Sequence, residues 1–371
     1  MSDDRDETAP SQASGLSTPV DTSVAAGPPG PAGPSVAAGP SSAAESTRTT
    51  TTLGTVPTLG GLYARALRPR RSPDLTHATL PDVTYRVADV VADEAQLVAY
   101  QRLLGEPVDG TLPAGFVHVL AFPVATALMV RDDFPLRLAG MVHLSNAVTV
   151  HRTISSDERL LVHAHAENLR PHRKGTQVDL VTEVSARYGA GDSTEAVWRG
   201  VSTYLAKGTM LGEDSADGDP SAVGGNADSA SGRPSFVPPT PTARWHLDAA
   251  TGRRYAAVSG DHNPIHLSAL TAKAFGFPRA IAHGMYTASR ALAQVGPSRG
   301  EAFDWTVEFA SPVLLPGAVD VAVSPRPHRS TSSPSAATPH PRASSSPGHD
   351  VVGWDARRTR LHLTGTVVPL G

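Results

Sequence analysis

The chain contains no cysteine among its 371 residues. A disulfide framework, a thiolate metal site and a cysteine nucleophile are therefore excluded. The net charge is only −3, with 18% charged residues, so the sequence predicts no basic surface for nucleic acid. No stretch has the length and uninterrupted apolarity of a membrane span. The N-terminus is acidic and lacks the apolar segment of a signal peptide. We therefore expect a cytoplasmic protein that binds neither nucleic acid nor membrane.

Three segments are too poor in apolar residues to form a core. Residues 1–58 are rich in Ser, Thr, Ala, Gly and Pro, which predicts a disordered tail. Residues 208–242 have the composition of a flexible linker that ends in a proline-rich stretch. Residues 324–349 are predicted to be a disordered insertion in a hairpin. The remaining chain divides into an N-terminal unit, 59–207, and a C-terminal unit, 243–371.

The N-terminal unit shows strand and helix patterns in a clear order. Residues 83–87 alternate like a strand, and Glu94–Leu104 has the pattern of a short helix. The segment 116–129 is apolar all round, as expected of a helix buried inside a wrapping sheet. Because proline is tolerated only in a first helical turn, we predict that the regular helix begins near Pro123. Strands are predicted at 142–150, 159–168, 176–187 and 196–207.

The C-terminal unit repeats this order. A helix is predicted from Met285 to Val295, where Gly296-Pro297 provides a stop signal. Strands are predicted at 305–309, 318–323, 351–355 and 360–368. One long helix and several strands per unit predict an α+β fold, in which an antiparallel sheet curves around a buried helix. The shared order suggests a duplication.

The stretch with the densest chemistry is Ser259-Gly260-Asp261-His262-Asn263-Pro264-Ile265-His266. Its residue types favour tight turns over regular structure. Asp261 and His266 can therefore come together across a bend. A carboxylate and an imidazole that share one water form a workable general acid/base pair.

A second stretch, Ile281-Ala282-His283-Gly284-Met285, precedes the predicted helix. The first backbone N–H groups of a helix have no intrahelical partners. The missing Cβ of Gly284 would let a ligand oxygen approach them closely. Such a helix start can stabilise the oxyanion that develops when a proton is moved next to a thioester carbonyl.

Together the two stretches resemble the hydratase motif of MaoC-like (R)-specific enoyl-CoA hydratases. The close match covers about residues 253–295. The resemblance implies a double hotdog fold, with a C-terminal catalytic unit and a degenerate N-terminal unit. It also implies that Asp261 and His266 activate water, and that the Gly284 N–H binds the thioester oxygen.

Other residues have ordinary structural explanations. Ser259 and Asn263 are expected to hold the loop through local hydrogen bonds, His283 to support the site by orientation, and Tyr255 to pack in the core. The N-terminal unit has no Asp-x-Asn-Pro-x-His before its helix. We therefore interpret His118 as a packed or substrate-lining residue.

Two further features are open to more than one interpretation. The arginines at 65, 68, 70 and 71 could contact coenzyme A phosphates, although a solvated surface is the favoured interpretation. A metal site built from Asp261, His262, His266 and His283 is possible by ligand type, but it matches no known spacing, so none is predicted.

The expected activity is reversible hydration of a trans-2-enoyl thioester to the (R)-3-hydroxyacyl thioester. No cofactor is expected, because coenzyme A or an acyl carrier protein arm belongs to the substrate. An acyl carrier protein is a possible partner, and a monomeric double hotdog or a homodimer fits the duplication. Two alternatives remain: a thioesterase on the same fold, and a non-catalytic acyl-binding subunit.

Overall fold

The computed structural model describes residues 48–69, 75–187, 194–212, 236–326, 347–358 and 360–371. Most of the predicted tail, linker and insertion lies outside the described residues. Arg70 and Arg71 of the arginine cluster lie outside them as well. The hairpin strands take in the ends of the predicted insertion, because one strand runs to Pro325 and the next begins at His349.

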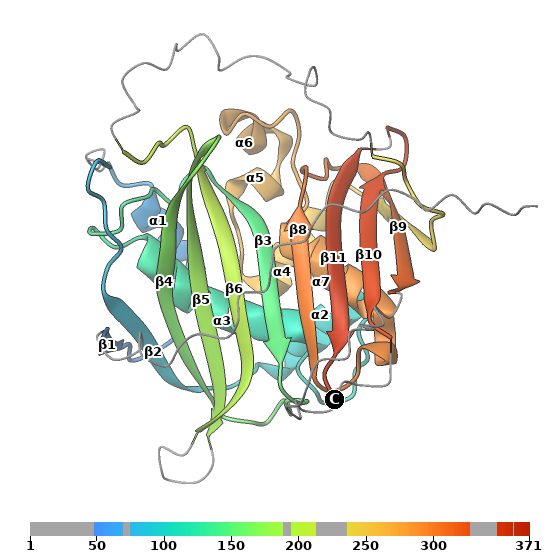
Figure 1. The fold of residues 1–371 in the computed structure, drawn as a ribbon, viewed down its shortest axis with the longest axis horizontal. Coiled ribbons are helices and arrows are strands. Elements are labelled where there is room, and N and C mark those ends of the chain that lie inside the picture. The colour runs from blue at the N-terminus through green and yellow to red at the C-terminus, as the bar shows by residue number, and fades with distance from the viewer. Residues whose placement is uncertain (1–47, 70–74, 188–193, 213–235, 327–346, 359) are drawn as a thin grey trace, which may run out of the picture. The chain divides into compact units, whose positions relative to one another are not determined.

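The described strands form one sheet of eleven, in the order β1-β2-β4-β5-β6-β3-β8-β11-β10-β9-β7 (Figure 1). Strands β1–β6 come from the first half of the chain and β7–β11 from the second, and the halves meet where β3 pairs antiparallel with β8. The bounds are β1 Thr49–Thr52, β2 Val83–Val90, β3 Met141–Val150, β4 Leu160–His172, β5 Gly175–Arg187, β6 Thr194–Lys207, β7 Ala243–Leu247, β8 Phe303–Phe309, β9 Gly317–Pro325, β10 His349–Asp355 and β11 Leu361–Pro369.

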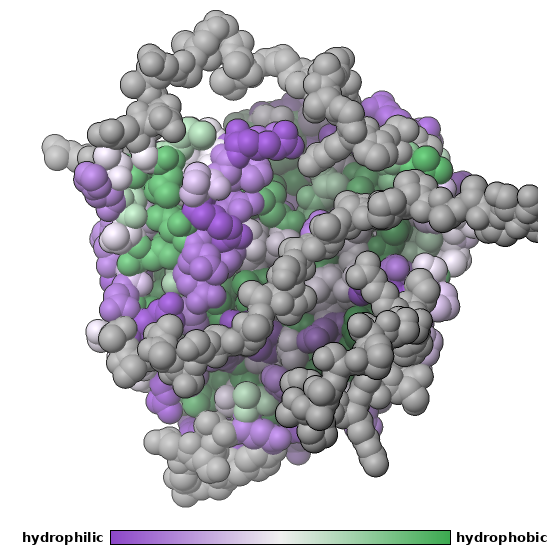
Figure 2. All heavy atoms as spheres, viewed as in Figure 1, coloured by the Kyte–Doolittle hydropathy of each residue, from purple (hydrophilic) through white to green (hydrophobic). Residues whose placement is uncertain are grey.

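The helices run behind the strands in the view of Figure 1, so they cover one face of the sheet. The opposite face carries a mixture of hydrophilic and apolar side chains (Figure 2). The helix bounds are α1 Leu59–Ala66, α2 Glu94–Leu104, α3 Ala114–Met129, α4 Thr251–Ser259, α5 Pro264–Leu267, α6 Ala269–Ala274 and α7 Gly284–Val295, followed by a 3-10 turn at Gly296–Arg299. The predicted α+β architecture is confirmed. No described helix is long and apolar enough to cross a membrane.

The long helices of the two halves, α3 and α7, pack against the sheet as the sequence patterns predict. All residues of α3 except Leu120 and Phe122 are buried. The helix α7 ends at Val295, as predicted, and begins at Gly284, one residue before the predicted start. The helix α2 also has its predicted bounds: the Asp93 carboxylate accepts the Gln96 N–H at 2.7 Å to cap its start.

The predicted start of the first long helix was wrong. The helix begins at Ala114, and Pro123 lies in its interior rather than in its first turn. Pro113 takes the position before the first turn, and its carbonyl accepts the N–H groups of Phe116 and Val117. An interior proline costs about 3 kcal/mol. Burial of a helix that is apolar all round, at about 1.5–3 kcal/mol per large side chain, outweighs this cost.

The predicted extent of the disordered tail also needs correction. Ordered structure begins before Leu59, because the strand Thr49–Thr52 pairs parallel with β2. The composition argument considered apolar anchors alone. Threonine is β-branched and favours strands, and here four threonines in a row obtain their hydrogen bonds from an existing sheet edge. This pairing brings the following helix α1 to the body of the protein.

A buried ion pair links the two halves on the helical side. The carboxylate of Glu106, which follows α2, accepts two hydrogen bonds from the guanidinium of Arg299, at 3.1 and 2.8 Å. The Glu106 side chain is 2% exposed and that of Arg299 18%. Near the junction of the sheet, the Thr149 hydroxyl donates to the Asp304 carboxylate at 2.7 Å. These contacts hold the second half, which carries the motif, against the first.

Candidate active site

The motif forms a tight loop between α4 and α5. Gly260 ends α4 in the left-handed conformation, with φ of 72°. The Ser259 hydroxyl donates to the Tyr255 carbonyl at 2.8 Å and accepts the Asp261 N–H at 3.2 Å. Asn263 caps α5, and its side-chain oxygen accepts the Ile265 N–H. Ser259 and Asn263 therefore make the local hydrogen bonds that were predicted to hold the loop.

The Asp261 carboxylate is held mainly through one of its oxygens. Its Oδ1 accepts the Asn263 N–H at 3.2 Å and the Tyr63 hydroxyl at 2.6 Å. Its Oδ2 lies 3.8 Å from His283 Nε2, and the side chain is 20% exposed. Burial raises the pKa of this carboxyl, but the two neighbouring imidazoles and the Tyr63 hydroxyl outweigh burial and hold the pKa below its usual value. Asp261 is therefore ionised at neutral pH.

His266 is buried in the short helix α5. Its Nδ1 lies 2.9 Å from the Ile281 carbonyl oxygen. Because a carbonyl only accepts, Nδ1 carries the proton and the Nε2 of the neutral ring keeps a lone pair. Burial, helped by the nearby His283 ring, lowers the pKa of His266 to about 3. The helices α4 and α5 pack closely at Gly252. A side chain would not fit there, because a Cβ on Gly252 would lie only 2.1 Å from the His266 carbonyl oxygen.

His283 and Gly284 form the start of α7. His283 is the N-cap, and its Nε2 donates to the backbone carbonyl of Asp261 at 2.9 Å. Burial lowers its pKa as well. Gly284 is the first helical residue, and a Cβ there would lie 3.0 Å from Cζ of Phe309. The glycine thus permits close packing at a helix start whose N–H groups lack intrahelical partners.

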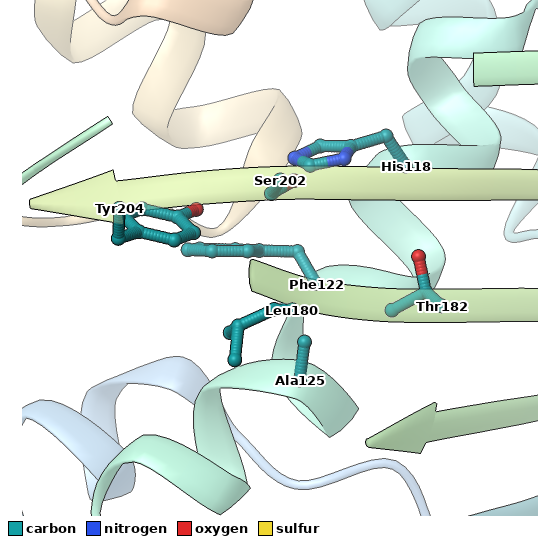
Figure 3. Close-up of a pocket in the computed structure, with 7 residues that line it drawn as sticks. All are labelled: His118, Phe122, Ala125, Leu180, Thr182, Ser202 and Tyr204. Carbon is teal, nitrogen blue, oxygen red and sulfur yellow. The ribbon is translucent and has the colours of Figure 1, made fainter. Parts of the chain in front are cut away.

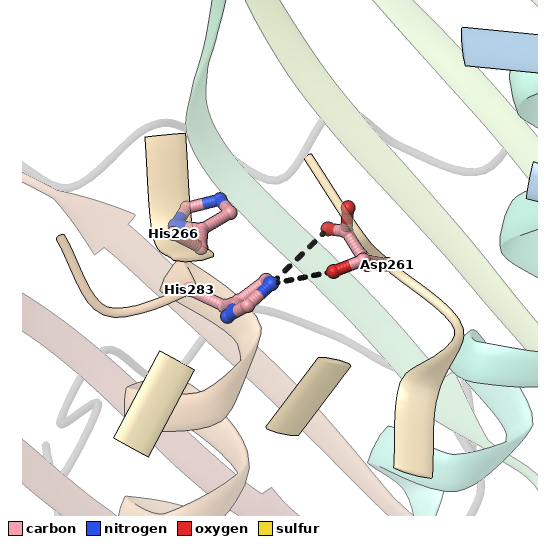
Figure 4. Close-up of side chains that lie close together, drawn as sticks. All are labelled: Asp261, His266 and His283. Atoms are coloured by element: carbon pink, nitrogen blue, oxygen red, sulfur yellow. Dashed lines mark hydrogen bonds and ion pairs between the residues drawn. The ribbon is translucent and has the colours of Figure 1, made fainter. Parts of the chain in front are cut away.

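The structure brings the predicted acid/base residues together (Figure 4). One nitrogen or oxygen atom from each of Asp261, His266 and His283 lies within 4.8 Å of the other two. The two imidazole rings stack, with centroids 3.7 Å apart. A metal ion could span these distances. However, each imidazole already donates one ring N–H to a backbone carbonyl, and the stacked rings turn their faces to one another. This arrangement suits proton transfer better than metal coordination.

Sequence reasoning missed Tyr63, whose hydroxyl reaches Asp261 from the N-terminal helix α1. No motif surrounds this tyrosine, and the nearby arginines at 65, 68, 70 and 71 are the feature that stands out in this part of the sequence. Arg65 forms an exposed ion pair with Asp132, at 3.6 Å. The sequence holds no signal that would have connected Tyr63 with a loop 198 residues further along.

A cavity beside the site is lined entirely by the first half of the chain (Figure 3). Its enclosed space is about 10 Å³, and the empty space rises to about 210 Å³ when the open solvent at its mouth is included. His118 lines it and is 7% exposed, and burial lowers the pKa of its ring to about 4. The other lining residues are Phe122 and Ala125 on α3, Leu180 and Thr182 on β5, and Ser202 and Tyr204 on β6.

Aromatic rings connect this cavity with the start of α7. The Tyr204 ring, which lines the cavity, stacks on His143 with centroids 4.6 Å apart. The His143 ring lies 5.2 Å from that of Phe309, and Phe309 borders Gly284. His118 therefore lies between this cavity and a cluster of aromatic rings. It is far from the Asp261 loop in sequence but close enough in space for the Asp261 charge to act on its ring.

Known proteins are similar to this chain in sequence and in fold. The family described as MaoC like domain matches residues 230–332. The chain is 36% identical to 3-hydroxyacyl-thioester dehydratase X of Mycobacterium tuberculosis over 251 residues, which are 66% of this chain and 81% of that protein. A 3-hydroxybutyryl-CoA dehydratase of Methylorubrum extorquens is 40% identical over 73 residues, 19% of this chain and 46% of that one.

Solved structures agree with the sequence comparison. The crystal structure of HtdX of Mycobacterium tuberculosis matches with a TM-score of 0.60 and 32% identity, covering 77% of this chain and all of that one. A MaoC-like dehydratase of Phytophthora capsici shares the fold, with a TM-score of 0.53 and 18% identity over 80% and 96% of the two chains. The chain therefore belongs to the MaoC-like dehydratase family, and its predicted double hotdog fold is confirmed.

Proposed function

We propose that this protein catalyses the reversible hydration of a trans-2-enoyl thioester to a 3-hydroxyacyl thioester, and the dehydration in reverse. One observation carries the proposal. The ionised Asp261 carboxylate and the neutral His266 ring converge beside the N-terminus of α7. Two proton acceptors beside a helix start that can bind an oxyanion are what addition of water to a conjugated thioester requires.

In the hydration direction, a water molecule lies between Asp261 and His266. The water donates one hydrogen to the carboxylate and the other to the His266 Nε2 lone pair. These two hydrogen bonds direct a lone pair of the water oxygen towards C3. As the C3–O bond forms, one proton passes to the Asp261–His266 pair and the C2=C3 electrons move to the thioester oxygen. The Gly284 N–H stabilises this enolate oxygen. The pair then returns a proton to C2, which completes the net addition of H and OH.

Each half of the chain has its own part in the proposal. The C-terminal unit, 243–371, supplies the reacting groups. The N-terminal unit, 59–207, supplies the acyl site, because the cavity beside Asp261 is lined by its residues alone. Coenzyme A or an acyl carrier protein arm would carry the acyl group. Addition of water causes no net oxidation or reduction, so the reaction needs no redox cofactor.

We assign the (R) configuration to the product from the resemblance of the motif to (R)-specific hydratases. In this assignment the pair Asp261–His266 and the Gly284 N–H lie on fixed sides of the bound enoyl plane, so water reaches only one face of C3. Chiral analysis of the 3-hydroxyacyl product tests the assignment separately from the activity.

The test of the proposed function is loss of the enoyl-thioester absorbance of crotonyl-CoA, with a thiol reagent present in a parallel sample. We expect the absorbance to fall without release of thiol. Asp261→Asn should reduce kcat by about 10²–10⁴-fold, because it removes the proton acceptor. Its side-chain oxygen can still accept from Tyr63 and from the Asn263 N–H, so the loop should keep its structure.

Asp304→Asn is the matched control, because it makes the same change at a carboxylate outside the site. Stoichiometric release of thiol would identify a thioesterase instead. Binding of crotonyl-CoA without turnover would identify a non-catalytic acyl-binding protein. Full activity of Asp261→Asn would remove Asp261 from the mechanism.

A further inference from the structure

The helix α1 reaches the catalytic loop although it lies outside the matched residues 230–332. It is anchored by the strand before it, since β1 pairs with β2 and the Leu53 N–H donates to the Arg86 carbonyl at 2.8 Å. Leu59, at the start of α1, is buried. It packs against Gly260, since a Cβ on that glycine would lie 3.6 Å from the Leu59 Cδ1. One turn later, the Tyr63 hydroxyl donates to Asp261 Oδ1 at 2.6 Å.

The hydrogen bonds on Asp261 are divided unequally between its two oxygens. Oδ1 accepts from both Tyr63 and the Asn263 N–H. Oδ2 has the His283 Nε2 at 3.8 Å, beyond hydrogen-bond distance. A carboxylate with two donors on one oxygen cannot rotate freely about its Cβ–Cγ bond. Its other oxygen is left as the proton acceptor.

We propose that Tyr63 is a positioning residue of the hydration site, which holds Asp261 Oδ1 so that Oδ2 faces the reacting water. The proposal rests on the proposed function. Tyr63 itself exchanges no proton with the substrate. Burial first, and then the charge of Asp261, raise the pKa of its hydroxyl well above the usual value, so that the hydroxyl remains a donor.

The hydrogen bond from Tyr63 also keeps the base ionised. A donor to a carboxylate stabilises the charged form and lowers its pKa. Loss of the Tyr63 hydroxyl therefore raises the pKa of Asp261. The acid limb of the kcat/KM profile then moves to higher pH. The other titratable groups that face Asp261 come from α3, β3, β6, α4, α5 and the start of α7; they are His118, His143, Tyr204, Tyr255, His266 and His283.

The experiment compares Tyr63→Phe with Tyr85→Phe in the full-length protein. Tyr85 is the matched control, because it loses a hydroxyl that is hydrogen-bonded to Arg131 outside the site. In Tyr63→Phe we expect kcat to fall about 10- to 100-fold, as for loss of a hydrogen bond to a charged group. We also expect the acid limb of kcat/KM to move to higher pH. Tyr85→Phe should leave both quantities unchanged.

A purely structural role for Tyr63 would lower the thermal midpoint without moving the pH profile. Tyr63→Phe with kcat within about twofold of the parent and an unshifted acid limb would overturn the proposal, since a lost charged hydrogen bond costs more than that.

If the parent protein hydrates no enoyl thioester, the proposed function fails, and the contact between Tyr63 and Asp261 is then tested by stability. Unfolding midpoints of Tyr63→Phe, Asp261→Ala and the double variant form a double-mutant cycle, because each single change removes one partner of the hydrogen bond. Non-additive effects that disappear at acidic pH, where Asp261 is protonated, would support the positioning contact. Additive effects at every pH would refute it.

Discussion

Replacing Gly284 by proline should delete the proposed oxyanion donor and leave the start of α7 in place. Gly284 is the first helical residue, where proline is common because the N–H has no partner within the helix. The preceding residue, His283, has φ of −61° and ψ of 137°, which is the conformation that a following proline favours. The first intrahelical bond, from the Thr287 N–H to the His283 carbonyl, does not involve the N–H of Gly284.

Gly284→Ala isolates the effect of the donor, because both variants add a Cβ. That Cβ would lie 3.0 Å from Cζ of Phe309, so each variant should lose about 1–3 kcal/mol of stability by overpacking. Only proline also removes the N–H. Loss of one oxyanion donor lowers kcat by about 10²–10³-fold, or about 2.7–4 kcal/mol in the barrier. The ratio of the two kcat values therefore measures the loss of the N–H together with the ring carbon that replaces its hydrogen.

The assay is hydration of crotonyl-CoA by both variants, with an unfolding midpoint measured for each. We expect the two midpoints to agree and kcat of Gly284→Pro to lie about 10²–10³-fold below that of Gly284→Ala. If the two kcat values differ by less than about threefold while both proteins are folded, the Gly284 N–H does not stabilise the transition state.

Three other predictions address the acyl cavity, the pH dependence and the junction of the two halves. Ala125→Leu should fill the cavity and lower kcat/KM for a long-chain enoyl-CoA by about tenfold or more, while crotonyl-CoA hydration is retained; equal losses on both substrates would place the acyl chain elsewhere. Burial lowers the pKa of His266 from 6.5 to about 3, so the stability that its neutral ring contributes is complete above about pH 6.5 and is lost as pH falls towards 3. Urea midpoints should therefore fall less between pH 7 and pH 5 in His266→Gln than in the parent, and parallel declines would contradict this. Glu106→Gln should leave the Arg299 charge poorly paired and destabilise the fold by about 2–4 kcal/mol, somewhat below the range for a fully buried pair because Arg299 keeps some exposure; an unchanged denaturation midpoint would show that the pair contributes nothing.

Local patterns predicted the elements that depend on neighbouring residues. The turn residues around Asp261 and Asn263 specify a tight loop because their side chains bond to the adjacent backbone, as Ser259 and Asn263 do. The start of α7 at Gly284 and its end before Pro297 follow from helix stop and start signals. The predicted strands follow from alternation, and their ends differ from the observed ends by a few residues. The strand β7 was not predicted.

Tertiary contacts decided what local patterns could not. Pro123 lies inside a helix because the surrounding sheet buries α3 on nearly every side, and a propensity argument contains no such burial energy. The strand Thr49–Thr52 exists because β2 offers it an open edge.

The residues of the candidate site also fall into two groups: those that the sequence indicated and those that only the tertiary structure revealed. Asp261, His266 and Gly284 could be named from the sequence, because they lie in two short motifs whose resemblance to a family implies their roles. Tyr63 and the cavity residues other than His118 could not. Tyr63 reaches Asp261 only through the pairing of β1 with β2 and the packing of α1 on the loop. Contacts between residues far apart in the chain leave no periodicity or spacing in the sequence, so only the tertiary structure could reveal them.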